Sequence, residues 1–344
     1  TGVVYPHKLK ILFAHFSTMK YELEALELPL YASSVFPNSQ IDMCYFDSRG
    51  RVSPVNKCYI CEVKDGNITS PKENLLSSYD IIITRSNTLR KMRSQFPNVL
   101  RSSSCKINIQ TNNFSPNFNI GEDFNFSHEE FYASGGRLFQ DQAQKLINTS
   151  GFQKQNIIAM VGTLIWWKGQ LKWLQKIDPS LLKGYQIVML GKISDRNYYD
   201  NIVRTVTDKK INFAFMNPVN PKFLADFLSL SKIHVMNHYT DPPEQPVLGP
   251  SRTFGESLVC NNITLQGQTY DNRLQGGQSS IVPKAWKNYT VEYNQENETS
   301  LNESFVNATS LVGKLGFSLL ESTEIKMDSI LSKCLALYES KNLT

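Results

Sequence analysis

Short apolar runs alternate with segments of helical periodicity along the first third of the chain. Leu9–Ala14 is a mainly apolar run, typical of a strand that is buried on both faces of a parallel sheet. Helical spacing of apolar residues follows over Tyr21–Val35. Further strands are predicted at Ile41–Phe46, Tyr79–Thr84 and Lys106–Gln110, with a basic helical stretch at Leu89–Gln95. This alternation predicts a doubly wound α/β domain.

A second alternating set begins after an irregular, Asn- and Phe-rich stretch at about residues 112–131. Its strands are predicted at Asn156–Gly162, Tyr185–Leu190, Ile211–Phe215, Ile233–Met236 and Ile263–Leu265. Its helices are predicted at Ala133–Asn148, Gly169–Lys176, Tyr198–Thr207, Pro221–Leu230 and Gly255–Cys260. A last helix, at about Glu324–Ser340, carries an apolar stripe that should pack on another surface.

The 344 residues suggest two domains, at roughly 150 residues per domain. We predict an α/β fold of two Rossmann-like domains with parallel sheets that face a cleft. The first domain is expected at residues 1–130, a linker with a helix at 131–149, and the second domain at 150–315. Residues 316–344 should form a helix that packs back towards the first domain. Ligands of open α/β sheets bind at the carboxyl ends of the strands, so site residues should directly follow strands.

Composition and charge exclude several classes of protein. With 41% hydrophobic and 19% charged residues, the chain is neither disordered, collagen-like nor a coiled coil. It has no run of about 18 apolar residues, so no transmembrane segment is expected. The net charge of +5 is dispersed, which disfavours nucleic acid as a partner and fits a solvated surface or attraction for a small anion. We expect a cytoplasmic location, with the secretory pathway as the alternative, and leave the oligomeric state open.

The cysteines and the N-glycosylation sequons give little indication of function. The six cysteines are scattered, and the lone Cys58-x-x-Cys61 lacks the further ligands of a zinc site, so ordinary thiols are favoured. Several sequons fall in or beside predicted strands or near the candidate site, where a glycan would not fit, so we interpret them as a consequence of an Asn- and Ser-rich composition, with secretion as the alternative. The sequons begin at Asn67, Asn113, Asn125, Asn148, Asn262, Asn288, Asn297, Asn302, Asn307 and Asn342.

Two short segments place a glycine directly after a buried strand. In Val161–Gly169, Gly162 ends the strand and Lys168 follows six positions later at the mouth of a helix. Glycine allows a ligand to approach the backbone, and a lysine near a helix N-terminus favours phosphate. In Tyr185–Lys192, Gly191 again follows the strand. Each segment by itself also fits an ordinary strand–turn–helix with a surface lysine.

The most specific segment is Asn237–Glu256, which lies between a strand and a helix and is stiffened by four prolines. Ser251 and the loop amides can bond phosphate oxygens, and Arg252 can clamp a diphosphate with two hydrogen bonds. Glu256, at the start of the helix, can accept hydrogen bonds from two ribose hydroxyls. The alternative is a structural loop in which Glu256 stabilises its own helix through the dipole.

Together these segments resemble, in order and spacing, the second domain of GT-B fold glycosyltransferases, especially the family-4-like glycosyl transferases group 1. That family carries Gly-Arg-Leu-x-x-x-Lys-Gly after the first strand of its second domain, which Gly162, Leu164, Lys168 and Gly169 match. Gly191 matches the glycine of its base pocket, and Glu256–Thr264 looks like its Glu-Ala-x-Ala-Cys-Gly-x-Pro-Val segment. The similarity covers about residues 155–270.

The chain departs from the family pattern at two positions. Thr163 stands where the family has arginine, which Arg252, Arg137 or Lys192 would have to offset. The first glutamate of the family's Glu-x7-Glu falls at Leu248, so that contact is either missing or moved to Glu244.

The resemblance implies a glycosyltransferase that moves a sugar from a UDP- or GDP-sugar to a glycan or other hydroxyl acceptor, with retention and without a metal or other cofactor. The first domain would bind the acceptor and the second domain the nucleotide sugar. The base would lie near Gly191 and Asn217–Asn220. The chain contains no Asp-x-Asp, which disfavours a manganese-dependent GT-A enzyme. The residues so implied are Lys168 and Arg252 for catalysis; Gly162, Thr163, Gly191, Lys192, Gly249, Pro250, Ser251, Gly255 and Glu256 for the donor; and, as weak candidates for the acceptor, His15, Ser17 and Arg85.

Three other functions stay open. They are a different sugar-nucleotide enzyme such as an epimerase or a phosphorylase-like protein, a non-catalytic relative that binds a nucleotide or glycan, and a two-domain solute-binding protein. The base, the sugar, the acceptor and the linkage are not encoded in any of these residues.

Overall fold

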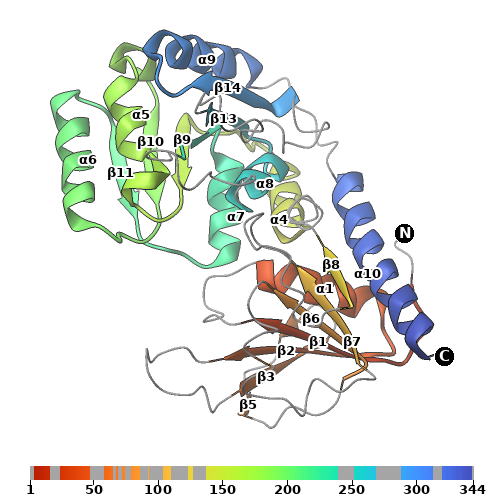
Figure 1. Cartoon of the computed structure of the whole chain (residues 1–344). Helices are drawn as coiled ribbons and strands as arrows, with labels where there is room; N and C mark the ends of the chain where they lie inside the picture. Colours follow the sequence, from red (N-terminus) through yellow and green to blue (C-terminus); the bar gives the residue numbers. More distant parts are fainter. Residues whose placement is uncertain are drawn as a thin grey trace. The chain divides into compact units, whose positions relative to one another are not determined.

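Figure 1 shows the computed structural model, in which the chain divides into two α/β units. Unit 1 consists of Thr1–Gly135 together with Glu321–Thr344, and unit 2 of Gly136–Leu320. The structure describes residues 4–15, 24–46, 58–64, 67–68, 72–73, 79–85, 92, 104–109, 123–126, 137–238, 252–268, 288–312 and 320–342.

Unit 1 is built on a mixed sheet with the strand order β4-β3-β2-β1-β6-β7-β8, and β5 pairs with β3. The neighbouring strands β2, β1, β6, β7 and β8 are parallel. The alternation predicts the first four, whereas β8 lies in the stretch that was expected to be irregular. β3 is antiparallel to β2, and β4 and β5 are antiparallel to β3. The antiparallel addition, which contains Cys58 and Cys61, was not predicted. The elements of unit 1 are β1 (Lys10–His15), α1 (Glu24–Val35), β2 (Gln40–Phe46), β3 (Cys58–Lys64), β4 (Asn67–Ile68), β5 (Lys72–Glu73), β6 (Ile81–Arg85), β7 (Cys105–Ile109), β8 (Phe124–Phe126) and α10 (Leu320–Asn342).

The helices α1 and α10 pack on one face of the unit 1 sheet. Ile11 of β1 shares a buried cluster with Tyr31 of α1 and Ile330 of α10. The two helices also bond to each other, because the Tyr31 hydroxyl donates to Asp328 Oδ1 at 2.5 Å. At the far end of α10, Lys341 Nζ lies 2.7 Å from Asp123 Oδ2. α10 is therefore part of unit 1, although it follows all of unit 2 in the sequence.

Unit 2 has a wholly parallel sheet in the order β11-β10-β9-β12-β13-β14. This is the 3-2-1-4-5-6 order of a Rossmann fold. The elements of unit 2 are α4 (Arg137–Ile147), β9 (Ile157–Val161), the 3-10 turn η2 (Trp166–Lys168), α5 (Gln170–Lys176), the 3-10 turn η3 (Pro179–Leu182), β10 (Gln186–Leu190), α6 (Arg196–Asp208), β11 (Phe213–Met216), α7 (Pro221–Leu230), β12 (Ile233–Met236), α8 (Arg252–Val259), β13 (Ile263–Gln268), β14 (Thr290–Asn294) and α9 (Glu298–Leu311).

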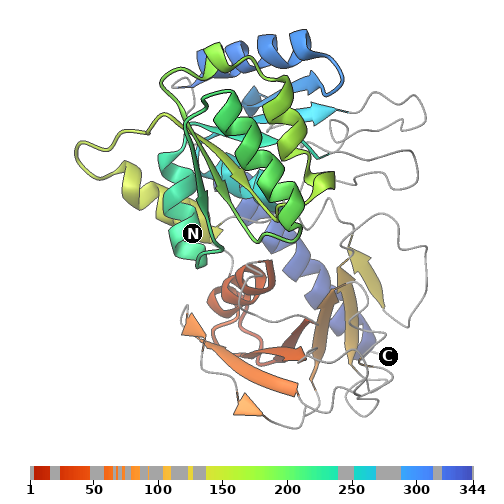
Figure 2. The same ribbon diagram turned by 90° about the vertical axis from the view of Figure 1, so that its left-hand side faces the viewer.

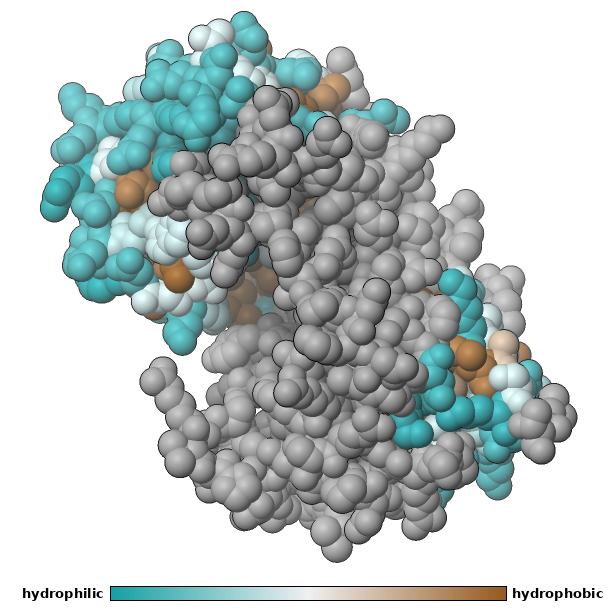
Figure 3. Space-filling view, in the orientation of Figure 1, coloured by the Kyte–Doolittle hydropathy of each residue, from teal (hydrophilic) through white to brown (hydrophobic). Residues whose placement is uncertain are grey.

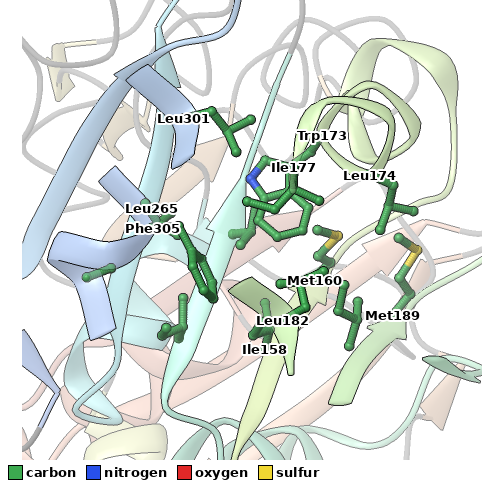
Figure 4. Packing of buried hydrophobic residues seen from close by; sticks show 14 of the residues in the cluster. Ile158, Met160, Trp173, Leu174, Ile177, Leu182, Met189, Leu265, Leu301 and Phe305 are labelled. Carbon is green, nitrogen blue, oxygen red and sulfur yellow. The ribbon is translucent and has the colours of Figure 1, made fainter. Parts of the chain in front are cut away.

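Helices cover both faces of this sheet, as Figures 1 and 2 show. On one face, Ile158 and Met160 of β9 pack against α5 and α9, whose Trp173 and Phe305 are fully buried (Figure 4). Because side chains alternate along a strand, the other positions face α4, α7 and α8. There Met236 of β12 packs with residues of α8. Burial on both faces explains why these strands read as nearly continuous apolar runs.

Most of the unit 2 elements lie where periodicity predicts them, and α7 and β12 have the predicted bounds. β14 and α9 were not predicted. α9 is short of apolar residues and buries only Leu301, Phe305 and Ala308, and its first turn is capped by the Asn297 side chain, which accepts from Ser300 N. The helix expected at Leu89–Gln95 lies, apart from Met92, outside the described residues.

The described surface is mainly hydrophilic in the view of Figure 3. Among its few exposed large hydrophobic residues are Trp166 and Trp167, which are 49% and 37% exposed. Within the described ranges, no helix combines the length and apolar character needed to cross a bilayer.

Among the described residues, four cysteines and one sequon asparagine are buried. Cys44, Cys105, Cys260 and Cys334 are buried and form no disulfide within the described part of the chain, in agreement with the prediction of ordinary thiols. The sequon asparagine Asn262 is fully buried, and its Nδ2 donates to Leu228 O at 2.7 Å. A glycan does not fit there in the folded protein.

Candidate functional site

The strand order of unit 2 creates a switch point between β9 and β12. The chain runs outward from β9 through β10 and β11, then returns to the other side of β9 to form β12. In such sheets the connections leave the two central strands in opposite directions, which opens a crevice at their carboxyl ends. The residues that follow β9 and β12 are therefore expected to contact a ligand.

Gly162 and Gly191 follow β9 and β10 and lie against each other. Gly162 has φ of 143°, in the region that favours glycine, and its N–H donates to Leu190 O at 2.9 Å. Gly191 has an ordinary φ, but a Cβ at this position would overlap the carbonyl oxygen of Gly162. Glycine is thus required at position 191 because two loop backbones approach each other closely. The resemblance instead implied that Gly191 makes room for the base of the nucleotide.

Lys168 is held at the carboxyl end of β9 by a tight turn. It ends the 3-10 turn η2, and Gly169 closes that turn in the left-handed region with φ of 68°. A Cβ at Gly169 would overlap the carbonyl oxygen of Asn237, which follows β12. Asn237 Nδ2 in turn donates to Gly169 O at 2.8 Å, and Tyr293 of β14 donates its hydroxyl proton to Asn237 Oδ1. The loops after β9 and β12 are therefore fixed to one another beside Lys168.

Lys168 and His238 meet at this point. Lys168 Nζ lies 3.1 Å from His238 Nε2 and 4.4 Å from the centroid of the Trp167 ring. Burial lowers the pKa of Lys168 to about 8. Burial, followed by the charge of Lys168 and by His234, holds the pKa of His238 well below its usual 6.5. The imidazole is thus neutral and accepts a hydrogen bond from the ammonium.

Both side chains line a partly open pocket at the switch point. Its empty volume, open mouth included, is about 290 Å³. The described residues that line it are Met160, Val161, Lys168, Gln170, Val235, Met236, Asn237 and His238. Lys168 and His238 are the basic groups of that lining, and no carboxylate belongs to it. The pocket therefore offers positive charge and hydrogen-bond donors to an anion.

Several residues that were predicted to bind the sugar nucleotide do not line this pocket. Thr163 contributes its carbonyl oxygen, which accepts from Gln170 Nε2 at 3.1 Å. Lys192 is exposed, and its carbonyl oxygen accepts from Leu164 N at 2.8 Å. Gly162 and Gly191 shape the loops, as described above. Together with Lys168, these four residues lie at the carboxyl ends of the neighbouring strands β9 and β10.

The helix that carries Glu256 differs from the prediction. α8 begins at Arg252 rather than near Gly255, so Glu256 lies beyond the first turn and does not open the helix. Gly255 is buried inside the helix, and the Glu256 side chain is buried too, at 3% exposure. Neither residue belongs to the lining of the described pocket.

Other predicted residues lie wholly or partly outside the described part of the chain. Gly249, Pro250, Ser251 and Ser17 are outside it. Arg252, His15 and Arg85 are described in their backbone only: Arg252 begins α8, and His15 and Arg85 end the neighbouring parallel strands β1 and β6.

The sequence arguments missed the residues that complete the pocket. Asn237 and His238 were part of the quoted loop segment but received no role. The sequence does indicate them as candidates, because both are polar and directly follow a buried strand. Gln295, whose Nε2 donates to His238 O at 2.7 Å, carries no comparable signal in the sequence. No group of three potential metal ligands exists among the described residues.

Comparisons with known proteins identify the fold. No family model matches the sequence, and no curated protein matches it significantly. Solved structures match nearly end to end. The catalytic domain of starch synthase IV from Arabidopsis thaliana, bound to ADP and acarbose, has 8% identity and a TM-score of 0.55 over 97% of this chain and 99% of that chain.

Two further glycosyltransferases are similar. AviGT4, a glycosyltransferase of avilamycin A biosynthesis, has 11% identity and a TM-score of 0.58 over 96% of this chain and 97% of that one. An alpha-glucosyltransferase in complex with UDP and a 13-mer DNA has 13% identity and a TM-score of 0.56 over 93% of this chain and 95% of that one. With its two Rossmann-like units, the chain has the GT-B glycosyltransferase fold.

Proposed function

We propose that the chain is a glycosyltransferase that moves a sugar from a nucleotide-diphosphate donor, a UDP- or GDP-sugar, to a hydroxyl acceptor such as a glycan. The observation that carries this proposal is Lys168, a cation without a carboxylate partner among the described residues, which lines the switch-point pocket of a GT-B fold. Fold alone does not give function, so the chemistry of this pocket has to support the activity.

The pocket supplies what departure of a nucleoside diphosphate requires. When the bond from the sugar to the diphosphate breaks, negative charge grows on the leaving phosphate oxygens. A fixed cation in a half-buried pocket stabilises that charge more strongly than it would in water. Lys168 meets this need, because η2, Gly169 and the Asn237 contact hold it in place before the ligand arrives.

The remaining donor contacts are part of the proposal. Arg252 would share the diphosphate with Lys168, the Gly249–Ser251 segment would offer donors to it, and Glu256 would hold the ribose hydroxyls. Gly191 and Asn217–Asn220 would frame the base. Unit 1 would bind the acceptor, with His15, Ser17 and Arg85 as its candidates. We propose retention of configuration and chemistry without a metal or other cofactor, on the resemblance and on the missing Asp-x-Asp motif.

A panel of sugar nucleotides tests binding first. UDP-glucose, GDP-mannose and ADP-glucose are screened by thermal shift, and the best donor is titrated by calorimetry. Lys168→Met should weaken binding about 10- to 100-fold, because a charge-assisted hydrogen bond contributes about 1.5–3 kcal/mol. Lys183→Met is the matched control, since Lys183 is exposed, lies outside the pocket lining and has no predicted donor contact; equal losses in both variants would place the diphosphate elsewhere.

Release of the nucleotide from the donor then separates an enzyme from a binding protein. An enzyme releases UDP or GDP slowly to water and faster with an acceptor, and Lys168→Met should lower kcat as well as raise KM. Donor binding without any release over an acceptor panel would favour the non-catalytic relative. Adding a DNA duplex to that panel tests the expectation that nucleic acid is not a partner.

A further inference from the structure

Two basic nitrogens share the pocket, and no carboxylate belongs to its described lining. Lys168 Nζ and His238 Nε2 are 3.1 Å apart, and both side chains line the pocket. An ammonium and an imidazole can approach this closely only when one of them is neutral, because two cations at that distance repel. The pair therefore carries one positive charge while the pocket is empty.

His238 is held in place by contacts other than its contact with Lys168. Its carbonyl oxygen accepts from Gln295 Nε2 at 2.7 Å, which fixes the backbone. Its ring meets the Trp167 ring edge-on, with centroids 6.0 Å apart. The preceding Asn237 is tied to Gly169. The imidazole is thus positioned by neighbours on several elements, and its Nε2 faces Lys168.

The titratable groups around His238 come from four described elements. Lys168 belongs to η2, and His234 belongs to β12, where it is fully buried. On β14, the hydroxyl of Tyr293 bonds Asn237 next to His238, and burial raises its pKa well above 10, so it stays neutral. α8, which packs on β12, contributes the buried Glu256.

We propose that His238 is a second diphosphate-binding residue: a bound sugar nucleotide draws a proton onto Nε2, so that Lys168 and His238 together present two positive charges to it. The inference rests on the proposed function. Protonation turns Nε2 from an acceptor into a donor. The contact with Lys168 then breaks, and both nitrogens donate to phosphate oxygens. The proton comes from solvent.

Charge complementarity supports this role. The diphosphate of a sugar nucleotide carries two negative charges. In the empty pocket the described lining supplies one positive charge, on Lys168, and a proton on His238 would add a second beside the proposed contact of Arg252. Burial, Lys168 and His234 keep His238 neutral in the empty pocket, and a nearby anion opposes all three effects. His238 therefore gains a proton only when the anion is present.

The test is proton uptake on binding, measured by calorimetry. The tightest of UDP-glucose, GDP-mannose and ADP-glucose is titrated near neutral pH in buffers of low and high ionisation enthalpy. Free UDP is avoided because its terminal phosphate titrates in this range, whereas the diphosphate of a sugar nucleotide does not. Below the Lys168 pKa of about 8, that lysine is already charged, so uptake reports His238.

The wild-type protein should take up about one proton per nucleotide, and its affinity should rise about tenfold for each pH unit lowered in this range. His238→Gln keeps a hydrogen-bond acceptor for Lys168 but cannot be protonated. It should show no uptake near neutral pH and a flat pH dependence. His7→Gln, which changes a histidine of unit 1, is the matched control and should behave like the wild type.

Each outcome decides the question. Binding by the wild type without proton uptake overturns the role of His238, and so does uptake that persists in a folded His238→Gln. If no sugar nucleotide binds the wild type, the proposed function fails and this inference fails with it. The wild-type measurement needs no variant. The imidazole nitrogen shifts of His238, recorded with and without nucleotide, report its protonation directly.

Discussion

The Cα atom of Gly191 faces the carbonyl oxygen of Gly162, and no side chain larger than hydrogen fits between them. The two glycines follow the adjacent strands β10 and β9. Their contact brings the loop that leads to Lys168 against the loop that leads to Lys192. The position of the proposed diphosphate site therefore depends on a backbone contact as well as on charged side chains.

Gly191→Ala should displace the Gly162 loop and with it Lys168. Overpacking of this kind costs about 1–3 kcal/mol of unfolding free energy. We expect that loss together with weaker binding of the best sugar nucleotide, measured by denaturation and calorimetry. Gly151→Ala is the control, because Gly151 has φ of 80° but no atom near a Cβ. It should lose stability through strain and keep full affinity; similar affinities in the two variants would contradict this account.

Lys154 links the C-terminal ends of two helices. Its Nζ donates to Ser229 O at 2.9 Å, Ser231 O at 2.7 Å and Cys260 O at 3.0 Å. These carbonyls lie at the C-terminal ends of α7 and α8, where helices leave acceptors without partners. A lysine at a helix C-terminus also interacts favourably with the dipole.

Lys154→Met should lower the unfolding free energy by about 3 kcal/mol, because it leaves several buried carbonyls without a donor. Lys209→Met is an informative comparison. Lys209 Nζ donates to Leu174 O, Gln175 O and Ile177 O at the end of α5, but at a more exposed site. Water can replace its ammonium, so a loss of about 1 kcal/mol is expected. Urea denaturation measures both, and equal losses would show that burial does not set the difference.

His234 should make the protein less stable in acid. It is fully buried, both ring nitrogens lack a hydrogen-bond partner among the described residues, and burial lowers its pKa to about 3. Between pH 6.5 and pH 3 the unfolded chain binds a proton at this site and the folded chain does not, so stability falls as the pH falls. We expect a loss of roughly 1–2 kcal/mol between pH 8 and pH 5 from this residue.

His234→Leu should remove that part of the pH dependence and cost little at pH 8, since no hydrogen bond is lost. Unfolding free energies of both proteins at the two pH values check this. An unchanged slope in the variant would assign the acid sensitivity to other groups.

Glu256→Gln tests the proposed ribose contact. The change keeps the shape of the buried side chain but removes its charge, so a carboxylate that accepts from two ribose hydroxyls would lose about tenfold or more in nucleotide affinity. Glu298→Gln is the control, because Glu298 is an exposed acid in the first turn of α9. It should cost a few tenths of a kcal/mol in stability and nothing in affinity. Unchanged affinity in Glu256→Gln would remove the ribose assignment.

Local patterns in the sequence predicted most of the parallel strands of both units, β8 and β14 excepted, and most of the helices. Strands buried on both faces, such as β9, β10 and β12, appear as apolar runs, and α7 has a capping asparagine and a proline at its start. The same local reasoning found Gly162, Lys168 and Gly191, because each follows a strand in sequence. These features depend on neighbours within a few residues.

Only the tertiary structure decided which strand ends meet. Lys168 and His238 are 70 positions apart, and they touch because the chain returns to place β12 beside β9. β14 and α9 gain their stability from packing on β13 and escape a periodicity argument, since few of their residues are apolar. Glu256 lies beyond the first turn because α8 starts three residues before the predicted glycine, and its side chain is buried. Strand order and burial depend on contacts far apart in sequence, which a local pattern does not encode.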